Sequence, residues 1–202
     1  SYEFCCTVDQ LGYAGGFIGH HSFSPEVKDE AAPFVYLAAI GAHTERMRLG
    51  TGVYLAGLHH PANIVEQVST LDRITNGRAV LGVGTGYREY EFKAYGTDYK
   101  RRGKRLDETL AVVRKAWATG SYEWDGEFLQ FDDVPVFPPA VQQPNPPIYV
   151  GGTSPAAITR AARYGDSWFT LPMETLPVVV KLVAQYRAKC AELGTTPRIC
   201  LM

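Results

Sequence analysis

RLGTGVYLAGLHHPANIVEQVSTLDRITNGRAVLGVGTG, residues 48–86, carries the pattern that decides the fold. Two short apolar runs rich in β-branched residues, 48–55 and 79–84, flank a segment at 62–76 whose apolar positions recur every three or four residues. The runs predict strands, and the segment between them predicts an amphipathic helix. Because a strand, a crossover helix and a second strand build a parallel sheet with a right-handed connection, this stretch predicts an α/β fold.

The same alternation of strand and helix continues on both sides of this stretch. Further strands are expected at residues 15–19, 147–152, 166–170 and 198–202, and further helices at 33–46, 102–119, 155–164 and 174–193. Glycine follows the last periodic residue of three helices, at Gly77, Gly120 and Gly194, where a left-handed C-terminal cap suits it best. A parallel sheet of this kind closes as a barrel or stays open as a doubly wound sheet, and the alternation is compatible with both.

Residues 121–146 interrupt this rhythm. YEWDGEFLQF predicts a small hairpin around Asp125 and Gly126, and VPVFPPAVQQPNPP predicts an extended, proline-rich return to the sheet. With 202 residues, of which 46% are hydrophobic, the chain can bury one sizeable core. We therefore expect a single domain over residues 1–202, with 121–146 as an excursion from it.

The charge balance bears on possible partners. Twenty Lys and Arg against 21 Asp and Glu leave a formal net charge of -1, which gives no electrostatic reason to expect a nucleic-acid or anionic-membrane partner. No apolar run approaches the roughly 18 to 20 residues that span a bilayer, and the first residues do not resemble a signal peptide. The four cysteines show neither metal-ligand nor disulfide spacing, so we expect a cytoplasmic protein.

Glycine, hydroxyl and imidazole groups follow the predicted strands. In a parallel barrel the ligand site forms at the carboxyl ends of the strands, so these groups are the candidates for binding and catalysis. They are His20 and His21, Thr51 and Gly52, His59 and His60, Thr85 and Gly86, and Gly151, Gly152, Thr153 and Ser154.

IYVGGTSPAAITRAARYG, residues 148–165, is the most specific of these local features. Its glycines let the backbone approach a ligand, Thr153 or Ser154 can cap the following helix, and Pro155 suits the first helical turn. Free N–H groups at a helix amino terminus can bind a phosphate, and an ordinary well-capped helix is an equal alternative. GVGTG at 82–86 lacks the spacing of a dinucleotide-binding loop, so its glycines either admit a flat ring or form a tight bend.

The paired histidines do not predict a metal site. Adjacent residues of an extended segment point to opposite sides, so His20 and His21, or His59 and His60, cannot readily share one ion. A single histidine that points into the site could act there as a general base or as a hydrogen-bond donor near pH 7. A histidine satisfied within the core is the alternative.

Four separate stretches resemble the bacterial luciferase-like flavin monooxygenases, in the order that this family shows. Residues 45–96 resemble its third-strand to fourth-strand core, and LGYAGGFIGHHSF, QPNPPIYVGGTSP and AARYGDSWFTLP resemble its second, fifth and sixth strands. The resemblance implies an eight-stranded parallel (β/α)8 TIM barrel, of which strands two to seven are visible. Strand one, strand eight and the last helices have no counterpart here.

The resemblance also implies a cofactor site at the mouth of the barrel, for FMN or for a deazaflavin, coenzyme F-420. His20 matches the catalytic histidine, Gly52–Val53 matches a non-proline cis peptide under the flavin ring, and Gly19 stands where the family carries a glutamate. Gly84 and Thr85 stand where the luciferases carry a cysteine and an arginine, so light emission is not expected. The predicted cofactor-binding residues are Thr51, Gly52, Val53, Thr85, Gly86, Gly151, Gly152, Thr153 and Ser154.

The expected activity follows from the resemblance alone. It implies a two-component monooxygenase that receives reduced FMN from a separate flavin reductase and uses dioxygen on a small organic substrate. A deazaflavin-dependent oxidoreductase that transfers hydride is one alternative, and a non-catalytic flavin-binding protein is another. A homodimer is expected, and the loops at 22–30 and 171–175, which would line the substrate pocket, carry no recognisable substrate code.

Overall fold

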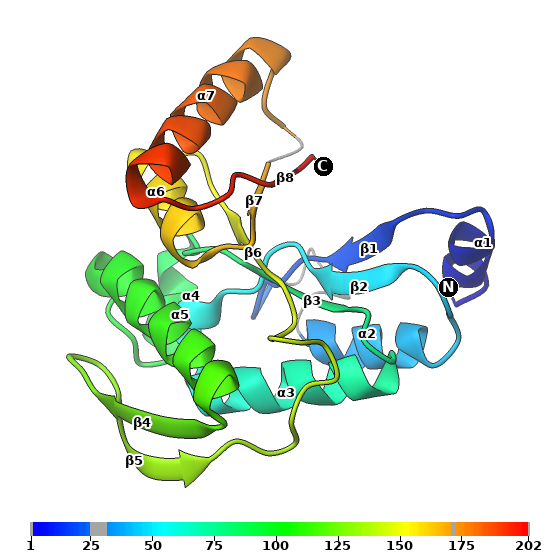
Figure 1. Ribbon diagram of the computed structural model, residues 1–202, viewed down its shortest axis with the longest axis horizontal. Helices are drawn as coiled ribbons and strands as arrows, with labels where there is room; N and C mark the ends of the chain where they lie inside the picture. The colour runs from blue at the N-terminus through cyan, green and yellow to red at the C-terminus, as the bar shows by residue number, and fades with distance from the viewer. Residues whose placement is uncertain (1, 25–31, 171–172, 202) are drawn as a thin grey trace.

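The computed structural model describes residues 2–24, 32–170 and 173–201, so parts of both predicted pocket loops and Met202, the last residue of the predicted strand 198–202, lie outside the described residues. A six-stranded sheet runs through the molecule (Figure 1). Its strands, in spatial order, are β1 (Gly15–Ile18), β2 (Arg48–Thr51), β3 (Ala79–Val83), β6 (Ile148–Gly151), β7 (Ser167–Phe169) and β8 (Ile199–Cys200).

The strand order identifies the type of sheet. Every neighbouring pair is parallel, and the spatial order follows the order along the chain. A doubly wound sheet reverses its order at a switch point, whereas a β/α barrel adds each strand beside the last. The sheet is therefore part of a β/α barrel, as the resemblance predicted, and all six predicted strands are present.

The sheet curls around an aromatic interior. The ring centroids of Phe17 on β1 and Phe169 on β7 lie 4.9 Å apart, although three strands separate these two in the sheet. Tyr149 on β6 completes the group, with its ring 5.9 Å from that of Phe169. Gly50 leaves room for this packing, because a Cβ there would lie 3.0 Å from the Phe17 ring and 2.7 Å from the Val80 carbonyl oxygen.

Helices cover the outer face of the curled sheet (Figure 1). They are α1 (Tyr2–Gln10), α2 (Pro33–Gly41), α3 (Pro61–Ile74), α5 (Arg102–Thr119), α6 (Pro155–Tyr164) and α7 (Leu176–Leu193). Their buried apolar side chains form one core with the strands, with Ile64 and Val68 of α3 and Leu110 of α5 among its members. Two of the predicted caps are confirmed, since Gly120 and Gly194 are left-handed C-caps of α5 and α7. Helix α3 ends two residues before the predicted end at 76: its C-cap is Thr75, and Asn76 and Gly77 follow with positive φ. Among the residues that the structure describes, no helix has the length and apolar composition that a membrane crossing requires.

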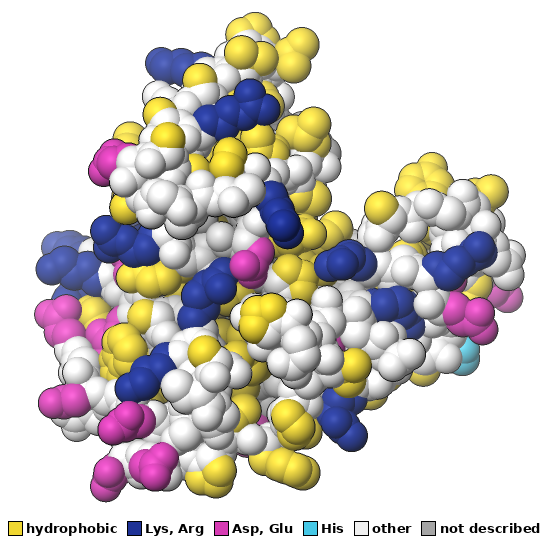
Figure 2. Space-filling view, in the orientation of Figure 1, with side chains coloured by type: hydrophobic (Ala, Val, Ile, Leu, Met, Phe, Trp, Pro, Cys, Tyr) yellow, Lys and Arg dark blue, Asp and Glu magenta, His cyan; other side chains and the backbone are white. Residues whose placement is uncertain are grey.

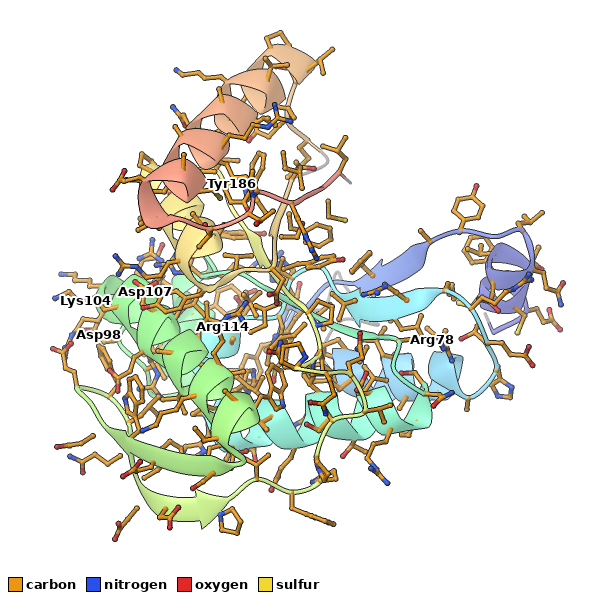
Figure 3. The ribbon with its side chains drawn as sticks, viewed as in Figure 1. Arg78, Asp98, Lys104, Asp107, Arg114 and Tyr186 are labelled. Carbon is orange, nitrogen blue, oxygen red and sulfur yellow. The ribbon has the colours of Figure 1, made fainter. Side chains whose placement is uncertain are left out.

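Helix α2 ends at Gly41, five residues before the predicted end at 46. The Arg78 guanidinium donates to the carbonyl oxygens of Gly41, Thr44 and Met47, and Asp9 accepts the backbone N–H groups of residues 45–47. These two side chains thus bind backbone groups of residues 41 and 44–47 that a longer helix would have paired (Arg78 is labelled in Figure 3). The prediction of 33–46 was too long because the partners lie far away in the sequence.

Strand β2 ends at Thr51, so the prediction of 48–55 was also too long. After β2 the backbone bonds first with β1 and then with β3. The Gly52 N–H donates to Ile18 O at 2.8 Å, and the Tyr54 N–H donates to Gly82 O at 2.7 Å. A 3₁₀ turn, η1 (Ala56–Leu58), follows. The structure also contains a six-residue helix that was not predicted, α4 (Glu89–Ala94), and a second 3₁₀ turn, η2 (Tyr99–Arg101).

The excursion at 121–146 contains the predicted hairpin, with β4 (Ser121–Asp125) antiparallel to β5 (Gln130–Pro135). The Glu108 carboxylate on α5 accepts the backbone N–H groups of Phe128 and Leu129 and so fixes the hairpin loop. Asp72 accepts the N–H groups of residues 141 and 142 in the proline-rich return. Figure 2 shows Asp and Glu side chains gathered over the hairpin, and no continuous basic tract on this face.

Candidate functional site

The carboxyl ends of β1, β2, β3 and β6 lie along one edge of the sheet. Ile18 is in register with Thr51, and Val83 is in register with Val150. Because all these strands are parallel, the residues that follow them meet at this edge. His20, Gly52, Thr85 and Thr153 are therefore brought together, and we call this edge the rim.

The Gly52–Val53 peptide bond is cis, as the resemblance predicted. Val53 packs over the ends of β3 and β6: a Cβ on Gly84 would lie 2.6 Å from Val53 Cγ2, and a Cβ on Gly151 would lie 3.0 Å from Val53 Cγ1. Gly86, with φ +74°, lies against the Phe92 ring. Packing within the protein thus already favours glycine at Gly84, Gly86 and Gly151, whose lack of a side chain was interpreted from the sequence as admitting a ligand or forming a tight bend.

The predicted cofactor-binding residues differ in their accessibility. Thr51 is fully buried, and its hydroxyl donates to Gly82 O at 2.7 Å and accepts the Gly82 N–H at 3.0 Å, so this side chain is occupied within the sheet. Gly151 is also buried. The other seven are half-buried or exposed on the rim: Gly52, Val53, Thr85, Gly86, Gly152, Thr153 and Ser154.

The loop after β6 has the capping geometry that the sequence predicted. Ser154 is the N-cap of α6, its hydroxyl accepts the Ala157 N–H at 3.2 Å, and Pro155 opens the helix. Gly152 has φ +127°, and a Cβ there would lie 2.7 Å from the Ala157 side chain, so only glycine fits. The amino terminus of this ten-residue helix lies beside β6 on the rim, with the half-buried Thr153 before it.

His20 is almost completely buried, at 2% exposure. The Leu55 N–H donates to its Nδ1 at 3.2 Å, and Nε2 lies 3.2 Å from the hydroxyl of Ser22. Burial, with the nearby His59 and His21, lowers the pKa of His20 to about 3, so the ring is neutral near pH 7. An amide N–H can only donate, so Nδ1 accepts and Nε2 carries the proton. His20 thus donates through Nε2 and is buried with both ring nitrogens paired.

A stack of neutral rings surrounds His20. Tyr54 stacks on His20 at 4.5 Å and on His59 at 4.7 Å between ring centroids. Burial lowers the pKa of His59 to about 4, and burial together with Tyr95 raises the pKa of Tyr54. Among the described residues, His59 Nε2 is buried without a hydrogen-bond partner. His60, by contrast, is exposed and packs on Phe131 of the hairpin.

Helix α4 and the residue that ends it add two polar side chains that the sequence did not single out. Glu91 is fully buried; its Oε1 accepts the Ser22 N–H at 2.9 Å and lies 3.4 Å from His21 Nδ1. Tyr95, one helical turn later, has its hydroxyl 3.0 Å from that of Ser22. Glu91 Oε2 is buried with no partner among the described residues. The only sequence signal was the four-residue spacing of Glu91 and Tyr95, which places them on one helix face.

His20 and His21 take different partners, as expected for adjacent residues. His20 bonds with Leu55 and Ser22, whereas His21 faces Glu91. Across residues 2–24, 32–170 and 173–201, no three His, Cys, Asp or Glu side chains gather in a way that could hold a metal ion.

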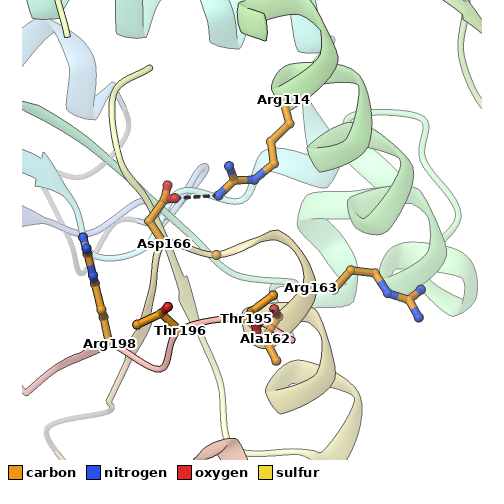
Figure 4. Close-up of a pocket in the computed structure, with 8 residues that line it drawn as sticks. Arg114, Ala162, Arg163, Asp166, Thr195, Thr196 and Arg198 are labelled. Atoms are coloured by element: carbon orange, nitrogen blue, oxygen red, sulfur yellow. Dashed lines mark hydrogen bonds and ion pairs between the residues drawn. The ribbon is translucent and has the colours of Figure 1, made fainter. Parts of the chain in front are cut away.

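A separate pocket of about 400 Å³ lies at the opposite edge of the sheet (Figure 4). Asp166, just before β7, pairs with Arg114 at 3.0 Å and accepts the Ile148 N–H at 2.8 Å. Thr195, Thr196 and Arg198 line the same pocket. In β/α barrels this amino-terminal edge contributes to stability rather than to catalysis, so the pocket is not part of the candidate site.

The curled parallel sheet, with polar groups along its carboxyl edge, has the architecture of β/α barrels. Proteins of this class bind their ligands at that edge, the mouth of the barrel. The family model described as luciferase-like monooxygenase matches residues 3–202, and the chain therefore belongs to the luciferase-like monooxygenase family.

Curated relatives include enzymes of two cofactor types. The oxygenase component of a flavin-dependent trigonelline monooxygenase from Acinetobacter baylyi is 31% identical over 93% of this chain and 52% of its own length. An FMNH2-dependent dimethylsulfone monooxygenase from Pseudomonas putida is 30% identical over 80% of this chain and 45% of its own length. An F420-dependent hydroxymycolic acid dehydrogenase from Mycobacterium tuberculosis is 31% identical over 82% of this chain and 46% of its own length. The two cofactor types expected for the family, FMN and deazaflavin, are both represented.

Solved structures share the fold. The monooxygenase RslO1 from Streptomyces bottropensis superposes with a TM-score of 0.88 and 30% identity, over 99% of this chain and 64% of its own. The oxygenating constituent of 3,6-diketocamphane monooxygenase from Pseudomonas putida, in complex with FMN, has a TM-score of 0.85 at 19% identity, over 99% of this chain and 59% of its own. The chain thus spans about half the length of the curated relatives and about three fifths of these structures.

Proposed function

We propose that this chain forms the flavin site of a two-component monooxygenase, which receives reduced FMN from a separate flavin reductase and uses dioxygen on a small organic substrate. The observation that carries the proposal is the meeting of His20, the cis Gly52–Val53 peptide, Thr85 and the Gly152–Ser154 loop on one rim. Relatives from Acinetobacter baylyi and Pseudomonas putida support the choice of chemistry.

The residues on the rim fit an FMN group. The α6 amino terminus, with Gly152, Thr153 and Ser154, would hold the phosphate through backbone N–H groups and the helix dipole. Gly52, Val53, Thr85 and Gly86, all half-buried, would contact the ring. His59 Nε2 is buried beside the stacked rings with no hydrogen-bond partner among the described residues, so it could bond with a polar atom of a bound cofactor.

The bound flavin would supply the oxygen chemistry, and the protein would supply orientation and water exclusion. His20 would act as a neutral positioning residue, because its Nδ1 accepts the Leu55 N–H and its Nε2 donates to Ser22. The stacked rings of Tyr54 and His59 would form an ordered wall beside His20. Such a wall would exclude water from the cofactor site.

A deazaflavin-dependent hydride transfer is the second candidate, favoured by the Mycobacterium tuberculosis dehydrogenase, which matches 82% of this chain. A non-catalytic flavin-binding protein is the third, and the absence of a glutamate at Gly19 favours it. Turnover with neither cofactor across a broad substrate panel, together with tight flavin binding, would select this third candidate.

The assembly follows from the same proposal. We expect residues 1–202 to act as one luciferase-like unit and to form a homodimer. A groove of about 720 Å³ between α2 and α3 supports the dimer, because most of its lining side chains are apolar, including the exposed Val35 and Ile74, with Glu66, Gln67 and Thr70 as its polar members. The four cysteines are all free thiols, which fits a reducing cytoplasm.

Anaerobic titration of the full chain with reduced FMN and with reduced coenzyme F-420, followed by air, tests the proposal. Tight binding of reduced FMN, with an oxidation rate in air that differs from that of free FMN, is expected. Tight binding of coenzyme F-420 without oxygen consumption would instead select the hydride-transfer enzyme. Binding of neither would contradict both.

A further inference from the structure

A chain of hydrogen bonds with a fixed direction begins at the Leu55 amide. This N–H has no acceptor capacity, so the 3.2 Å contact makes His20 Nδ1 the acceptor. A neutral imidazole carries one proton, which must then reside on Nε2. Nε2 therefore donates to the Ser22 hydroxyl, 3.2 Å away.

The direction continues through Ser22, which is 4% exposed. Its oxygen accepts from His20, and its hydrogen requires an acceptor of its own. Among the described residues the oxygen of Tyr95, at 3.0 Å, is the acceptor available to it. The reverse orientation would leave a buried hydroxyl hydrogen unpaired, which costs about 1 to 3 kcal/mol.

Tyr95 is the last member of the chain. Its oxygen accepts from Ser22, and its own hydrogen meets no acceptor within residues 2–24, 32–170 and 173–201. The side chain is 38% exposed, and its ring is held by His59 at 5.0 Å and Phe23 at 5.6 Å between centroids. Glu91 also holds this end of the chain of hydrogen bonds, because it lies on α4, which Tyr95 directly follows, and accepts the Ser22 N–H.

We propose that the Tyr95 hydroxyl is the hydrogen-bond donor that this site offers to its organic ligand, directed by the Leu55 amide through His20 and Ser22. The ligand it fits carries an uncharged acceptor oxygen, such as a carbonyl. The inference rests on the proposed function, which places the ligand beside a flavin. Within that site it identifies Tyr95 as a residue that determines substrate specificity. A ligand of the same shape that lacks an acceptor atom would form no hydrogen bond with Tyr95 and would bind more weakly.

The direction of the chain can be tested without cofactor or substrate. In full-length protein labelled with ¹⁵N in its histidine rings, we expect His20 to show a protonated Nε2 and an unprotonated Nδ1 between pH 5 and pH 9. A protonated Nδ1 would overturn the chain. This measurement is independent of flavin binding, so it stands if the proposed function fails.

The ligand contact can be tested with two probes of the same shape, cyclohexanone and methylenecyclohexane, on the FMN-loaded protein and again without FMN. We expect the ketone to bind about tenfold more tightly, which corresponds to about 1.4 kcal/mol, one hydrogen bond. Tyr95→Phe should bring the ratio of the two affinities close to one while FMN affinity is retained. Ser22→Ala, which breaks the chain upstream, should lower the ratio by several-fold.

Tyr90→Phe is the matched control, because Tyr90 lies on α4, which Tyr95 directly follows, is 47% exposed, and has its hydroxyl bound by Arg88. It should leave the ratio unchanged. An equal ratio in wild type and Tyr95→Phe, no preference for the ketone in wild type, or no saturable ketone binding would each overturn the proposal. Loss of FMN binding with the ketone preference intact would defeat the proposed function and leave Tyr95 as a donor.

Discussion

Val53 and Gly84 are in such close contact that a Cβ on residue 84 would lie 2.6 Å from Val53 Cγ2. Real Cβ atoms do not approach that closely, so either Val53 or the end of β3 would have to move. Val53 is also one of the predicted flavin contacts, so a flavin bound as proposed would make the packing of the rim and the binding of the cofactor depend on the same side chain.

Gly84→Ala should therefore lower both stability and flavin affinity. We expect a loss of about 1 to 3 kcal/mol in the free energy of unfolding, typical of overpacking, measured by urea titration. Val53→Ala in the same chain should recover part of the loss by making room. Gly16→Ala is the control, because its Cβ would meet no atom closer than 3.8 Å. An equal loss in both alanine variants would contradict a role for Val53.

Glu91→Ala should destabilise the fold by about 1 to 3 kcal/mol, because the buried Ser22 N–H loses its acceptor. Glu91→Gln keeps a carbonyl at that position and should cost less. Chemical denaturation of the two variants beside Glu89→Ala, an exposed residue of the same helix, provides the comparison. A larger loss for Gln than for Ala would show that the Oε1 contact does not stabilise the turn.

Stability should fall in mild acid because of His20 and His59. The folded-state pKa values are lowered to about 3 and about 4, from a usual value of 6.5. Below about pH 6.5 the unfolded chain therefore binds protons that the folded chain does not, and each histidine removes about 1.4 kcal/mol per pH unit. Above that pH the two states bind equally and the effect vanishes.

Thermal unfolding followed between pH 5 and 7 measures this slope. His20→Asn should reduce it by about half, and His60→Asn, at an exposed position, serves as the control. An unaltered slope in His20→Asn would mean that the ring is not held neutral by burial.

Thr153→Asp should discriminate between FMN and riboflavin. A carboxylate at the α6 amino terminus would compete with a phosphate there, so we expect FMN to bind at least about tenfold more weakly while riboflavin binding changes little. Fluorescence titration measures both affinities. Thr196→Asp adds the same charge at the opposite edge of the sheet and should spare FMN. Equal weakening of both ligands would place the phosphate elsewhere.

The overall fold could be predicted because its signals are local. Each of the six strands is a short apolar run, and the helices α5 and α6 begin and end at the predicted residues. The end of α2 could not be predicted, because the side chains that hold residues 42–47, Arg78 and Asp9, are distant in sequence. Helix α4 was missed because its six residues are too few to establish a helical period.

The candidate site was predicted only in part, for a physical reason. Glycine, hydroxyl and imidazole groups at strand ends are visible in the sequence, and parallel strands bring them to one edge. The stack of His20, Tyr54 and His59, and the Ser22 contacts of Glu91 and Tyr95, depend on three separate loops meeting. Contacts between separate loops leave no spacing pattern in the sequence, so they could not be predicted from it.

The most direct measurement is a map of backbone amide shifts by ¹H–¹⁵N nuclear magnetic resonance as FMN is added to the full chain. A flavin seated as proposed should move the signals of Gly52, Thr85, Thr153 and Ser154, and should leave those of Asp166 and Thr196 in place. Shifts confined to Asp166 and Thr196, or no saturable shift at all, would contradict the account.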